Sequence, residues 1–445
     1  MFYLELDNFG NNVALYDGSR TMTYSQLEKA VSSFAQSCNS KKSLVAMEME
    51  PNIGSIVAYL GYLRANWTIM MVDAALEKGL KDAIYKQYKP DFIYSENIET
   101  RYSNVKSDLL DVLALMLPTS GSTGSFKYVR LSKENLHANT KSIVKYLPLG
   151  SQDVAITNLP LYYSYGLSVL HTHLSVGASV VLSSSSILSK EFWELFDRFG
   201  VTNFNGVPYH YEMLKKLGFL KKNYSALRFM TQAGGKLNEQ LVKSFATWSK
   251  EHTKEFYVMY GQTEATARIS YLPPDITLQK PNSIGLSIPG GELFLQDTKT
   301  PYKESQLCYR GPNVMLGYAT KKEDLKKQDE QNAYLETGDV GYIDREGYFY
   351  ITSRASRFIK LYGSRINLDE IEQFLKTQGI EVVVVGKEDT LIVYTQNADT
   401  ARVKAMLIKR YTLHHRAVHV ENVNSFAYKS NGKFDYQKML EQFNG

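Results

Sequence analysis

The sequence predicts an α/β protein with a large N-terminal body that includes a β-rich subdomain, followed by a small, mobile α+β domain at the carboxyl end. Amphipathic helical stretches alternate with apolar, strand-like runs from the amino terminus onward, as in residues 23–38 and 43–50. This alternation is typical of α/β folds. From Leu293 onward, short segments rich in Tyr, Gly and Asp replace the helical periods, and past Ser353 the pattern changes once more.

The body continues with a predicted strand in SVGASVVLSSSS (175–186), a helix in EFWELFDRF (191–199) and a strand in VTNFNGVP (201–208). The segments QLCYRGPNVMLGY (306–318) and GYIDREGYFYI (341–351) then predict an antiparallel, turn-rich β subdomain. All of these elements belong to the predicted N-terminal body.

The carboxyl-terminal part has its own set of elements. Residues 356–378 predict a strand, a Gly-containing turn and a helix, and two strands follow in EVVVVGKE and LIVYTQ. A further helix is predicted for ARVKAMLIKRY (401–411). Because no low-complexity linker separates the two parts, the connection near Ser353 must be a short hinge. The predicted domains are residues 1–353 and 354–445.

Composition and charge argue against a nucleic-acid-binding protein and a membrane-inserted protein. The chain has 445 residues, of which 44% are hydrophobic and 22% charged, as is typical of a soluble globular protein. A net charge of +5 over this length does not indicate a nucleic-acid partner. No apolar stretch approaches the roughly 20 residues that span a bilayer, and the amino terminus lacks a signal-peptide pattern. We therefore expect no membrane insertion and a cytoplasmic location.

The segment LPTSGSTGSFKYVRLS (117–132) is the most informative. Its run of hydroxyl residues and glycines suits a loop whose amides and hydroxyls surround phosphate oxygens, with Lys127 as the countercharge. The preceding ALML predicts a strand that leads into the loop. The segment is not a Walker A loop, because position 126 is Phe where that pattern requires Gly. A flexible surface linker is the alternative interpretation.

A second segment, FYVMYGQTEATAR (256–268), predicts a strand that ends in polar residues, the place where α/β folds bind ligands. Glu264 could hold Mg²⁺, and Tyr260 could lie against a base. The alternative is a helix N-terminus in which Thr263 is the cap and Glu264 favours the first turn.

Two further polar residues follow turn signals. Asp339 comes after Thr337-Gly338, and a carboxylate there could accept both hydroxyls of a ribose, as the acidic residue of dinucleotide folds does. Lys433 stands in an Asn-Gly turn near the carboxyl end. The alternatives are a common turn for the first and a solvated lysine for the second.

Taken together, these motifs have a specific order: TSGSTG-x-x-K, YGQTE, TGD, SR-x-x-x-x-IK-x-x-G-x-RI-x-x-x-EIE and NGK-x-D. Weaker matches are TYSQLEKA, LPLYYSYGL, NGVPYHYEML, LRFMTQAGGKL and YRGPNVMLGY. The chain thus resembles, over nearly its whole length, the adenylate-forming superfamily of acyl- and aryl-CoA synthetases, luciferases and nonribosomal-peptide adenylation domains.

The resemblance implies a large domain that binds ATP and an acid, and a small domain that swings on a hinge. It implies that ten residues bind the nucleotide. The β- and γ-phosphates are contacted by Thr119, Ser120, Ser122, Thr123 and Lys127. Adenine is surrounded by Gly234, Gly235 and Tyr260, and the ribose is bound by Asp339 and Arg354. It also implies that Thr263 contacts the α-phosphate, that Glu264 binds Mg²⁺, and that Lys433 bridges the substrate carboxylate and the α-phosphate.

The sequence departs from the family pattern at four positions. Phe126 and Tyr128 replace the usual Pro and Gly on either side of the loop lysine, Ser353 replaces the Gly of a Gly-Arg pair, and Ser356 occupies the hinge position. The first two changes bear on loop mobility and the last on domain rotation.

The acid is expected to be an uncharged acyl or aryl acid. The segment LPLYYSYGLSVLHTHL (159–174) contains no acidic residue, whereas amino-acid-activating relatives place an Asp there to pair the ammonium group. Tyr163, Tyr165 and Tyr209 could line an aromatic-walled cleft. His171 and His173, placed on one face of a strand, lack a visible third metal ligand.

The predicted activity is a two-step ligase reaction: carboxylate and Mg-ATP give an acyl-adenylate, which a thiol of CoA or of a phosphopantetheine-bearing acyl or peptidyl carrier protein then attacks. Residues 402–420 carry five Lys or Arg and no carboxylate, and could contact CoA phosphates or an acidic carrier. A solvated helix face is the alternative there. Adenylation of an amino acid and a non-catalytic nucleotide-binding relative remain the alternative functions.

Overall fold

A computed structural model provides the structure of the chain. It describes residues 1, 3–18, 20–38, 41–103, 107–119, 126–354, 357–361, 364–387, 389–411, 413–429 and 432–443. The chain forms two compact units: the first comprises Met1–Leu293 and Tyr309–Leu335, and the second Phe294–Cys308 and Glu336–Gly445. The mixed α/β fold predicted from the sequence is confirmed, while the domain boundary after Ser353 stays a prediction.

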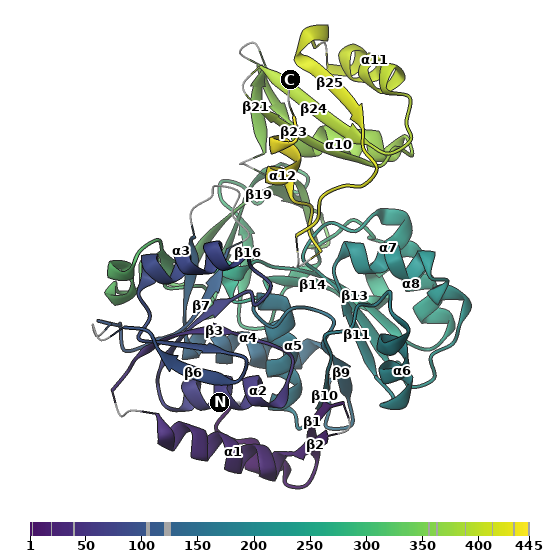
Figure 1. Ribbon diagram of the computed structural model, residues 1–445. Coiled ribbons are helices and arrows are strands. Elements are labelled where there is room, and N and C mark those ends of the chain that lie inside the picture. Colours follow the sequence, from purple (N-terminus) through teal and green to yellow (C-terminus); the bar gives the residue numbers. More distant parts are fainter. Residues whose placement is uncertain are drawn as a thin grey trace. The chain divides into compact units, whose positions relative to one another are not determined.

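A seven-stranded sheet is the largest sheet of the first unit (Figure 1). Its inner strands are parallel and apolar, since β3 (LVAME) and β4 (TIMMV) are buried along their whole lengths. The antiparallel strands β8 and β18 extend one edge. In spatial order the strands are β18 (Gly317–Ala319), β8 (Tyr128–Ser132), β7 (Leu113–Pro118), β4 (Thr68–Val72), β3 (Leu44–Glu48), β5 (Phe92–Ser95) and β6 (Ile98–Arg101).

The helices of this part begin at the caps that the sequence provides. The predicted helix after Thr23 is α1, in which Thr23 and Gln26 form a capping box and Leu27 and Val31 lie on the buried face. A second capping box, between Ser132 and Asn135, begins the helix after β8. The helices are α1 (Tyr24–Ser37), α2 (Ile53–Arg64), α3 (Lys78–Tyr88), α4 (Lys133–Tyr146) and α5 (Ser164–Ser175).

A five-stranded sheet also belongs to the first unit. Its order is β11 (Asn203–Gly206), β12 (Phe229–Gln232), β13 (Glu255–Tyr260), β14 (Ser270–Leu272) and β15 (Leu286–Ser287), and the first three strands are parallel. Figure 1 shows α6 (Lys190–Arg198) and α8 (Glu239–Glu251) beside β11 and β13. Helices α7 (Pro208–Lys216) and α9 (Pro274–Thr277) complete this layer. The parallel order places the carboxyl ends of β12 and β13 at one edge.

A four-stranded sheet of order β2-β1-β10-β9 completes the first unit, with β1 (Val13–Asp17), β2 (Arg20–Thr23), β9 (Val154–Ile156) and β10 (Ser179–Leu182). The strand predicted in residues 175–186 is thus confirmed as β10, and the helix and strand predicted after it are α6 and β11. Among the residues that the structure describes, no helix has the length and apolar character needed to cross a membrane.

The prediction that His171 and His173 lie on a strand is wrong, because both belong to helix α5. A continuous apolar run does not distinguish a buried strand from a buried helix. Two residues apart on a helix, the side chains point in different directions. His171 Nε2 is 2.7 Å from the Tyr59 hydroxyl, whereas His173 Nε2 accepts a hydrogen bond from Asn203 Nδ2 at 2.9 Å. Burial lowers the pKa of His171 to about 3, so it is a neutral core residue.

A sheet of order β16-β17-β19-β20 corresponds to the predicted β-rich subdomain. The strands are β16 (Glu292–Leu295), β17 (Ser305–Arg310), β19 (Tyr334–Ile343) and β20 (Phe349–Arg354), and β19 pairs with β20 in antiparallel register. The expected turn at Thr337-Gly338 is wrong, because both residues lie inside β19. Gly338 has φ of +73°, a conformation that explains why a turn-like dipeptide occurs within a strand.

The carboxyl-terminal elements confirm the predicted α+β pattern. Strands β21 (Phe358–Leu361) and β22 (Ser364–Asn367) form a hairpin that precedes α10 (Leu368–Thr377). Strands β23 (Val382–Lys387), β24 (Thr390–Thr395) and β25 (Val418–Asn422) form a sheet, and α11 (Thr400–Tyr411) and α12 (Tyr436–Glu441) complete the part. The core lies between α10, α11 and this sheet, with Ile371, Leu375, Val384, Val393 and Leu407 inside it.

Arg357 holds several of these elements together. Its guanidinium pairs with Asp369 at 3.1 Å and with Glu372 at 3.0 Å, and its centre lies 3.8 Å from the centroid of the Tyr436 ring. Glu372 is buried and also accepts a hydrogen bond from the Val384 amide at 2.9 Å. Arg357 therefore neutralises a buried carboxylate at the junction of α10 and β23.

We expect Arg357→Met to destabilise this part of the chain by about 3–5 kcal/mol, since removing one partner leaves a buried charge uncompensated. Native-state hydrogen exchange of the β23 and β24 amides measures the loss. The control is Lys376→Met, which removes a more distant and more exposed partner of the same Glu372, at 3.9 Å, and should cost less than about 1 kcal/mol. Equal losses in the two variants would contradict the prediction.

Candidate functional site

The predicted phosphate loop connects β7 to β8, and the predicted strand ALML lies in the buried β7. Ser120, Ser122 and Thr123 lie outside the described residues, so the structure bears on the two ends of the loop. These ends are joined, because the amide and the hydroxyl of Thr119 donate to the Lys127 carbonyl at 3.1 and 3.2 Å. The ends of β7 and β8 thus hold the loop closed at its base.

Phe126, which replaces the proline usual in the family, anchors one end of this loop. Its side chain packs against a buried apolar cluster, and its carbonyl accepts a hydrogen bond from the Tyr88 hydroxyl at 2.7 Å. Because Phe126 precedes Lys127 directly, this contact fixes the backbone from which the Lys127 side chain extends.

Lys127 forms one element of a three-residue arrangement with Tyr318 and Glu264. Its ammonium nitrogen lies 3.3 Å from the centroid of the Tyr318 ring, and the Tyr318 hydroxyl donates to Glu264 Oε1 at 3.0 Å. Within the described ranges Lys127 forms no ion pair. Its N–H donors are therefore available to an anion.

Strand pairing explains how these three residues meet. Lys127 directly precedes β8, and Tyr318 of β18 is in antiparallel register with Val129 of β8. The chain before β18 contacts the segment 256–268, since the Met315 amide donates to the Glu264 carbonyl at 2.9 Å. Burial raises the pKa of Tyr318, and the charge of Glu264 and the hydrogen bond to it raise it further. Tyr318 therefore stays a neutral donor to Glu264.

The YGQTE segment continues from the carboxyl end of β13, where Tyr260 is the last residue of the strand. The alternative of a helix N-terminus is correct for Glu264, which lies in the first turn of the short 3-10 helix η3 (Thr263–Ala265). It is wrong for Thr263, because the cap position is that of Gln262, which makes no side-chain cap. The Thr263 hydroxyl lies 3.4 Å from that of Ser164 in α5. The Gln262 amide nitrogen is buried and has no hydrogen-bond partner in the described part of the chain.

Gly234 and Gly235 follow β12, the strand next to β13. Because β12 and β13 are parallel, these glycines and Tyr260 lie at the same edge of the sheet. The Gln232 side chain donates to the Gly235 carbonyl at 2.8 Å, so the chain after β12 is held close to the strand end. The structure thus brings together the three residues expected around adenine.

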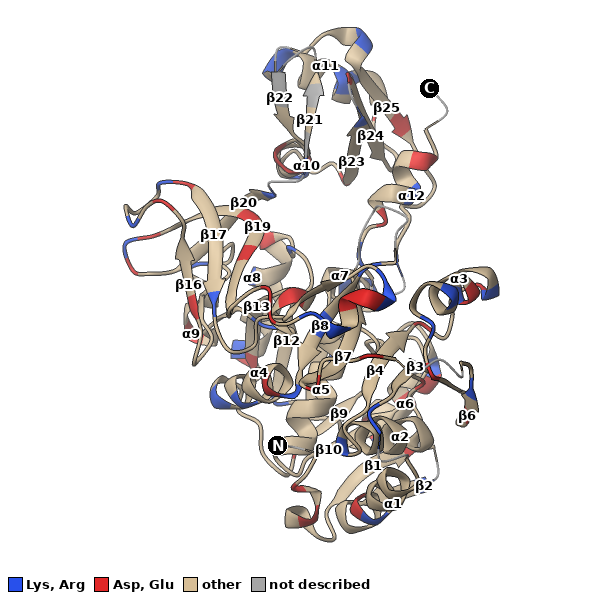
Figure 2. Ribbon diagram, turned by 90° about the vertical axis from the view of Figure 1, so that its left-hand side faces the viewer, with Lys and Arg blue, Asp and Glu red and all other residues tan. Residues whose placement is uncertain are grey.

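Asp339 and Arg354 are brought together in the second unit. They are directly opposite each other in the β19–β20 register, and Arg354 Nε lies 3.0 Å from Asp339 Oδ1. Asp339 is 4% exposed, whereas Arg354 is exposed. In Figure 2 the ribbon of β19, the strand that carries Asp339, is partly red, the colour of Asp and Glu.

Lys433 lies after Gly432 in a narrow loop. Its carbonyl accepts a hydrogen bond from the Lys429 amide at 2.8 Å, and Tyr428 and Phe434 form an antiparallel bridge beside it. The Lys433 residue is partly exposed. These contacts join the chain on the two sides of the predicted turn, whose Asn431 lies outside the described residues.

The three tyrosines predicted to line an acid pocket belong to one apolar cluster. Tyr165 is 1% exposed, and its hydroxyl lies 2.7 Å from that of Thr231. Tyr163 and Tyr209 are partly buried residues that pack against the same cluster. The structure therefore groups these residues, with Tyr165 as the innermost of the three.

Sequence reasoning missed four residues that shape this region: Tyr318, Ser164, Asn313 and Arg268. Asn313 Nδ2 donates to the Ala265 carbonyl at 2.8 Å and to the Arg268 carbonyl at 2.9 Å, which fixes the chain after η3. The sequence did indicate the region of Tyr318 and Asn313, since both lie in the family-like motif YRGPNVMLGY (309–318). No pattern in the sequence indicated which side chains they meet.

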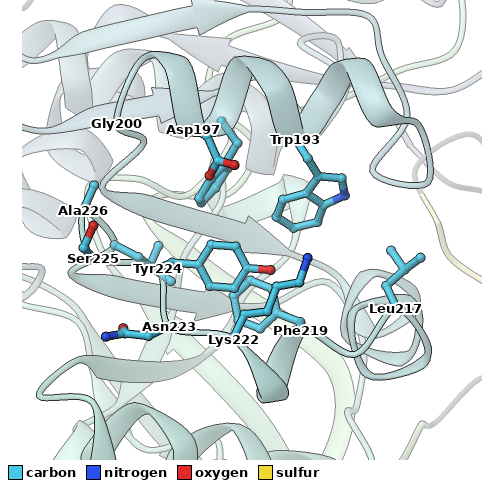
Figure 3. A pocket seen from close by; sticks show the side chains of 12 residues that line it. Trp193, Asp197, Gly200, Leu217, Phe219, Lys222, Asn223, Tyr224, Ser225 and Ala226 are labelled. Atoms are coloured by element: carbon cyan, nitrogen blue, oxygen red, sulfur yellow. The ribbon is translucent and has the colours of Figure 1, made fainter.

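A separate hollow of about 540 Å³ lies between α6 and the loop around the short 3-10 helix η2 (Phe219–Lys221). Figure 3 shows the rings of Trp193, Phe219 and Tyr224 facing it. None of its lining residues is one of the candidate residues above.

Comparison with known proteins identifies the family to which the chain belongs. The chain belongs to the AMP-binding enzyme family, whose model matches residues 80–319. The resemblance inferred from the motifs is thereby confirmed.

Curated relatives are CoA ligases. Over 273 residues the chain is 30% identical to oxalate–CoA ligase of Arabidopsis thaliana, covering 59% of this chain and 52% of the relative. Over 325 residues it is 27% identical to 2-succinylbenzoate–CoA ligase of Bacillus subtilis (strain 168), covering 72% and 65%. The chain thus matches between about half and two thirds of the length of these relatives.

Solved structures share the whole fold. The o-succinylbenzoate CoA synthetase from Bacillus subtilis, in complex with its acyl-adenylate intermediate, matches with a TM-score of 0.81 at 19% identity, covering 100% of this chain and 98% of that one. The same enzyme with ATP and magnesium matches with a TM-score of 0.79 at 20% identity, covering 99% of each chain. These matches support the fold.

Gly261 is expected to tolerate no side chain. A Cβ at this position would lie 2.0 Å from the Ala267 carbonyl oxygen, so Gly261→Ala must displace the backbone between η3 and β14. We expect a loss of about 1–3 kcal/mol in the free energy of unfolding, measured by chemical denaturation. The control is Gly79→Ala in α3, where a Cβ meets nothing within 4 Å. A Gly261 variant as stable as the Gly79 variant would disprove the close approach.

Proposed function

We propose that the protein activates a carboxylic acid with ATP through an acyl-adenylate and then forms a thioester with CoA or with a carrier-protein thiol. A carboxylate oxygen of the acid attacks the α-phosphorus, and the bond from that phosphorus to pyrophosphate breaks. The thiol sulfur then attacks the acyl carbon, the carbon–oxygen bond to AMP breaks, and the thiol proton passes to solvent. The observation that carries this proposal is the arrangement of Lys127, Tyr318 and Glu264 at the base of the Ser/Gly/Thr loop.

The residues at this base suit the phosphates of ATP. Lys127 offers an ammonium with no carboxylate partner within the described residues, and Thr263 offers a hydroxyl in the same unit. The Thr119 hydroxyl donates to the Lys127 carbonyl and would rotate to donate to a phosphate oxygen. We assign Lys127, Thr119 and, by resemblance, Ser120, Ser122 and Thr123 to the β- and γ-phosphates, and Thr263 to the α-phosphate. Phosphate oxygens accept hydrogen bonds from all of these groups.

Glu264 suits Mg²⁺, because a carboxylate oxygen is a ligand that this hard cation prefers. Tyr318 donates to Oε1 of Glu264, which orients the carboxylate and leaves its other oxygen for the ion. When bound, Mg²⁺ would neutralise phosphate charge and stabilise the departing pyrophosphate.

The adenosine part of ATP has two sets of proposed contacts. Gly234, Gly235 and Tyr260 would surround adenine, beside the buried Gln262 amide nitrogen that lacks a partner within the described residues. Asp339 would accept the ribose hydroxyls, and Arg354 would orient that carboxylate through the ion pair at 3.0 Å. A paired, well-positioned carboxylate is a suitable acceptor for a diol.

Lys433 is proposed to act in the adenylation step itself. An anionic carboxylate must approach a polyanionic phosphate, and at an effective dielectric constant of about 20 a charge pair ~4 Å apart contributes ~4 kcal/mol. A lysine that bridges the carboxylate and the α-phosphate converts part of this repulsion into attraction. The step transfers no proton, so no acid–base pair is required.

The nucleotide contacts leave open which thiol accepts the acyl group and which acid is activated. The curated relatives are named as CoA ligases, which favours CoA over a carrier protein. Their named acids differ, from oxalate to long-chain fatty acids, so the acid must be argued from this chain's own residues. We place its non-reacting part among Tyr163, Tyr165 and Tyr209.

We expect Lys433→Ala to lower acid-dependent ATP–pyrophosphate exchange by about 100-fold or more, because a contact made to the reacting groups stabilises the transition state. ATP affinity, measured by calorimetry, should change little. The control is Lys438→Ala, an exposed lysine on α12. Undiminished exchange in Lys433→Ala would remove the assigned role.

We expect Asp339→Asn to weaken ATP binding by roughly 10-fold or more, because hydrogen bonds to a charged group contribute about 1.5–3 kcal/mol. Equilibrium titration with ATP measures the change. Glu336→Gln is the matched control, since Glu336 is an exposed carboxylate on the same strand. An Asp339 variant with the ATP affinity of the control would contradict the ribose contact.

A further inference from the structure

Arg268 is a buried cation within the tyrosine cluster assigned to the acid. It lies between η3 and β14, and the residue is 3% exposed. Its guanidinium centre is 4.1 Å from the centroid of the Tyr165 ring. A positive charge therefore lies against the innermost of the three tyrosines.

The contacts of this guanidinium are unusually weak for a buried arginine. Arg268 Nε donates to the Met259 sulfur at 3.4 Å, and Nη1 donates to the Ala267 carbonyl at 3.3 Å. No carboxylate in the described part of the chain pairs with it. A guanidinium has five N–H donors, and besides these two contacts a hydrogen bond joins it to the Tyr146 hydroxyl, so all of its acceptors are uncharged.

Two other arginines with little exposed surface in the described part of the chain, Arg130 and Arg357, are paired. Arg130 lies 2.6 Å from Glu330 and donates to backbone carbonyls, including that of Leu316 at 3.0 Å. Arg357 pairs with two carboxylates, as described above. Arg268 stands apart from both, because burying a charge without an anionic partner is costly.

The neighbouring tyrosines do not supply the missing negative charge. Burial raises the pKa of Tyr146 and of Tyr165, and the charge of Arg268 offsets only part of this effect at both hydroxyls. Both side chains therefore stay neutral near pH 7. Tyr146, Tyr163, Tyr209 and Tyr271 are partly exposed members of the same cluster.

The backbone of Arg268 is fixed, so its side chain extends from a defined position. Its carbonyl accepts hydrogen bonds from Asn313 at 2.9 Å and from Asn139 at 3.3 Å. The next amide, that of Ile269, donates to the Tyr260 carbonyl at 2.9 Å. The same short segment thus carries Tyr260, Thr263 and Glu264 toward the nucleotide and Arg268 toward the tyrosine cluster.

We propose that Arg268 binds a second negatively charged group of the acid substrate, so that the substrate class is a dianionic acid such as a dicarboxylate. This inference rests on the proposed function. It departs from the uncharged acid expected from residues 159–174, because the absence of an acidic residue there argues against an ammonium group and says nothing about an anion. One carboxylate of the acid reacts at the α-phosphorus, and the other pairs with the guanidinium.

The test compares straight-chain dicarboxylic acids of two to eight carbons and the three benzenedicarboxylic acids with their monocarboxylic counterparts. Acid-dependent pyrophosphate release is measured for the unmodified protein, for Arg268→Met, and for Arg228→Met. Arg228 is the control because its partner, Asp153 at 2.6 Å, is a protein carboxylate. ATP affinity serves as the check that each variant is folded.

The unmodified protein should prefer at least one dianionic acid over its counterpart by about 100-fold or more in kcat/KM, as expected of a site built to bind a polar group. Arg268→Met should abolish this preference, Arg268→Lys should restore part of it, and Arg228→Met should leave it unchanged. Preference for monocarboxylic acids, or a preference unchanged in Arg268→Met, would overturn the proposal.

A second measurement separates this proposal from the proposed function. Calorimetric titration of the same dicarboxylic acids, without turnover, tests the anion site alone. If no acid releases pyrophosphate but a dicarboxylate binds the unmodified protein and not Arg268→Met, the function fails and the anion site stands. If no dicarboxylate binds, the anion site is disproved whatever the activity.

Discussion

The pairing of β18 with β8 is the interaction on which the candidate site depends. It places Tyr318 beside the strand that begins after Lys127, and the chain before β18 returns to Glu264 through the Met315 amide. Three segments that lie far apart in the sequence thereby meet around one aromatic ring. A neutral tyrosine between a cation and a carboxylate keeps the two apart while orienting both, so that each remains available to a ligand of opposite charge.

Much of the fold could be predicted because local signals agreed with tertiary structure. The amphipathic stretch after Thr23, the apolar runs of β3 and β7, and the pattern past residue 353 each correspond to observed elements. Prediction failed where one pattern suits two structures. The helix around His171 is buried on nearly all sides, so its sequence lacks the one-sided apolar pattern that separates a helix from a strand. Thr337-Gly338 has turn residues inside a strand.

The candidate site could be predicted in its residue types but not in its contacts. Motif order identified Lys127, Glu264 and Asp339, and the structure shows the partners that hold two of them: Tyr318 for Glu264 and Arg354 for Asp339. Arg268 was missed for a different reason. It was within a quoted motif, but an arginine is usually exposed, and only burial without a carboxylate makes this one unusual.

The segment from Tyr260 to Arg268 links the two halves of the proposed chemistry. Its first residues are assigned to the nucleotide, and Arg268 lies in the tyrosine cluster, with both ends fixed through the Tyr260–Ile269 hydrogen bond and the Asn313 contacts. The cation–π contact with Tyr165 offsets up to about 2 kcal/mol of the burial cost, whereas an unpaired buried ion costs several. An anionic ligand would offset part of the remainder, which is the physical reason to expect a negatively charged group of the acid beside Arg268.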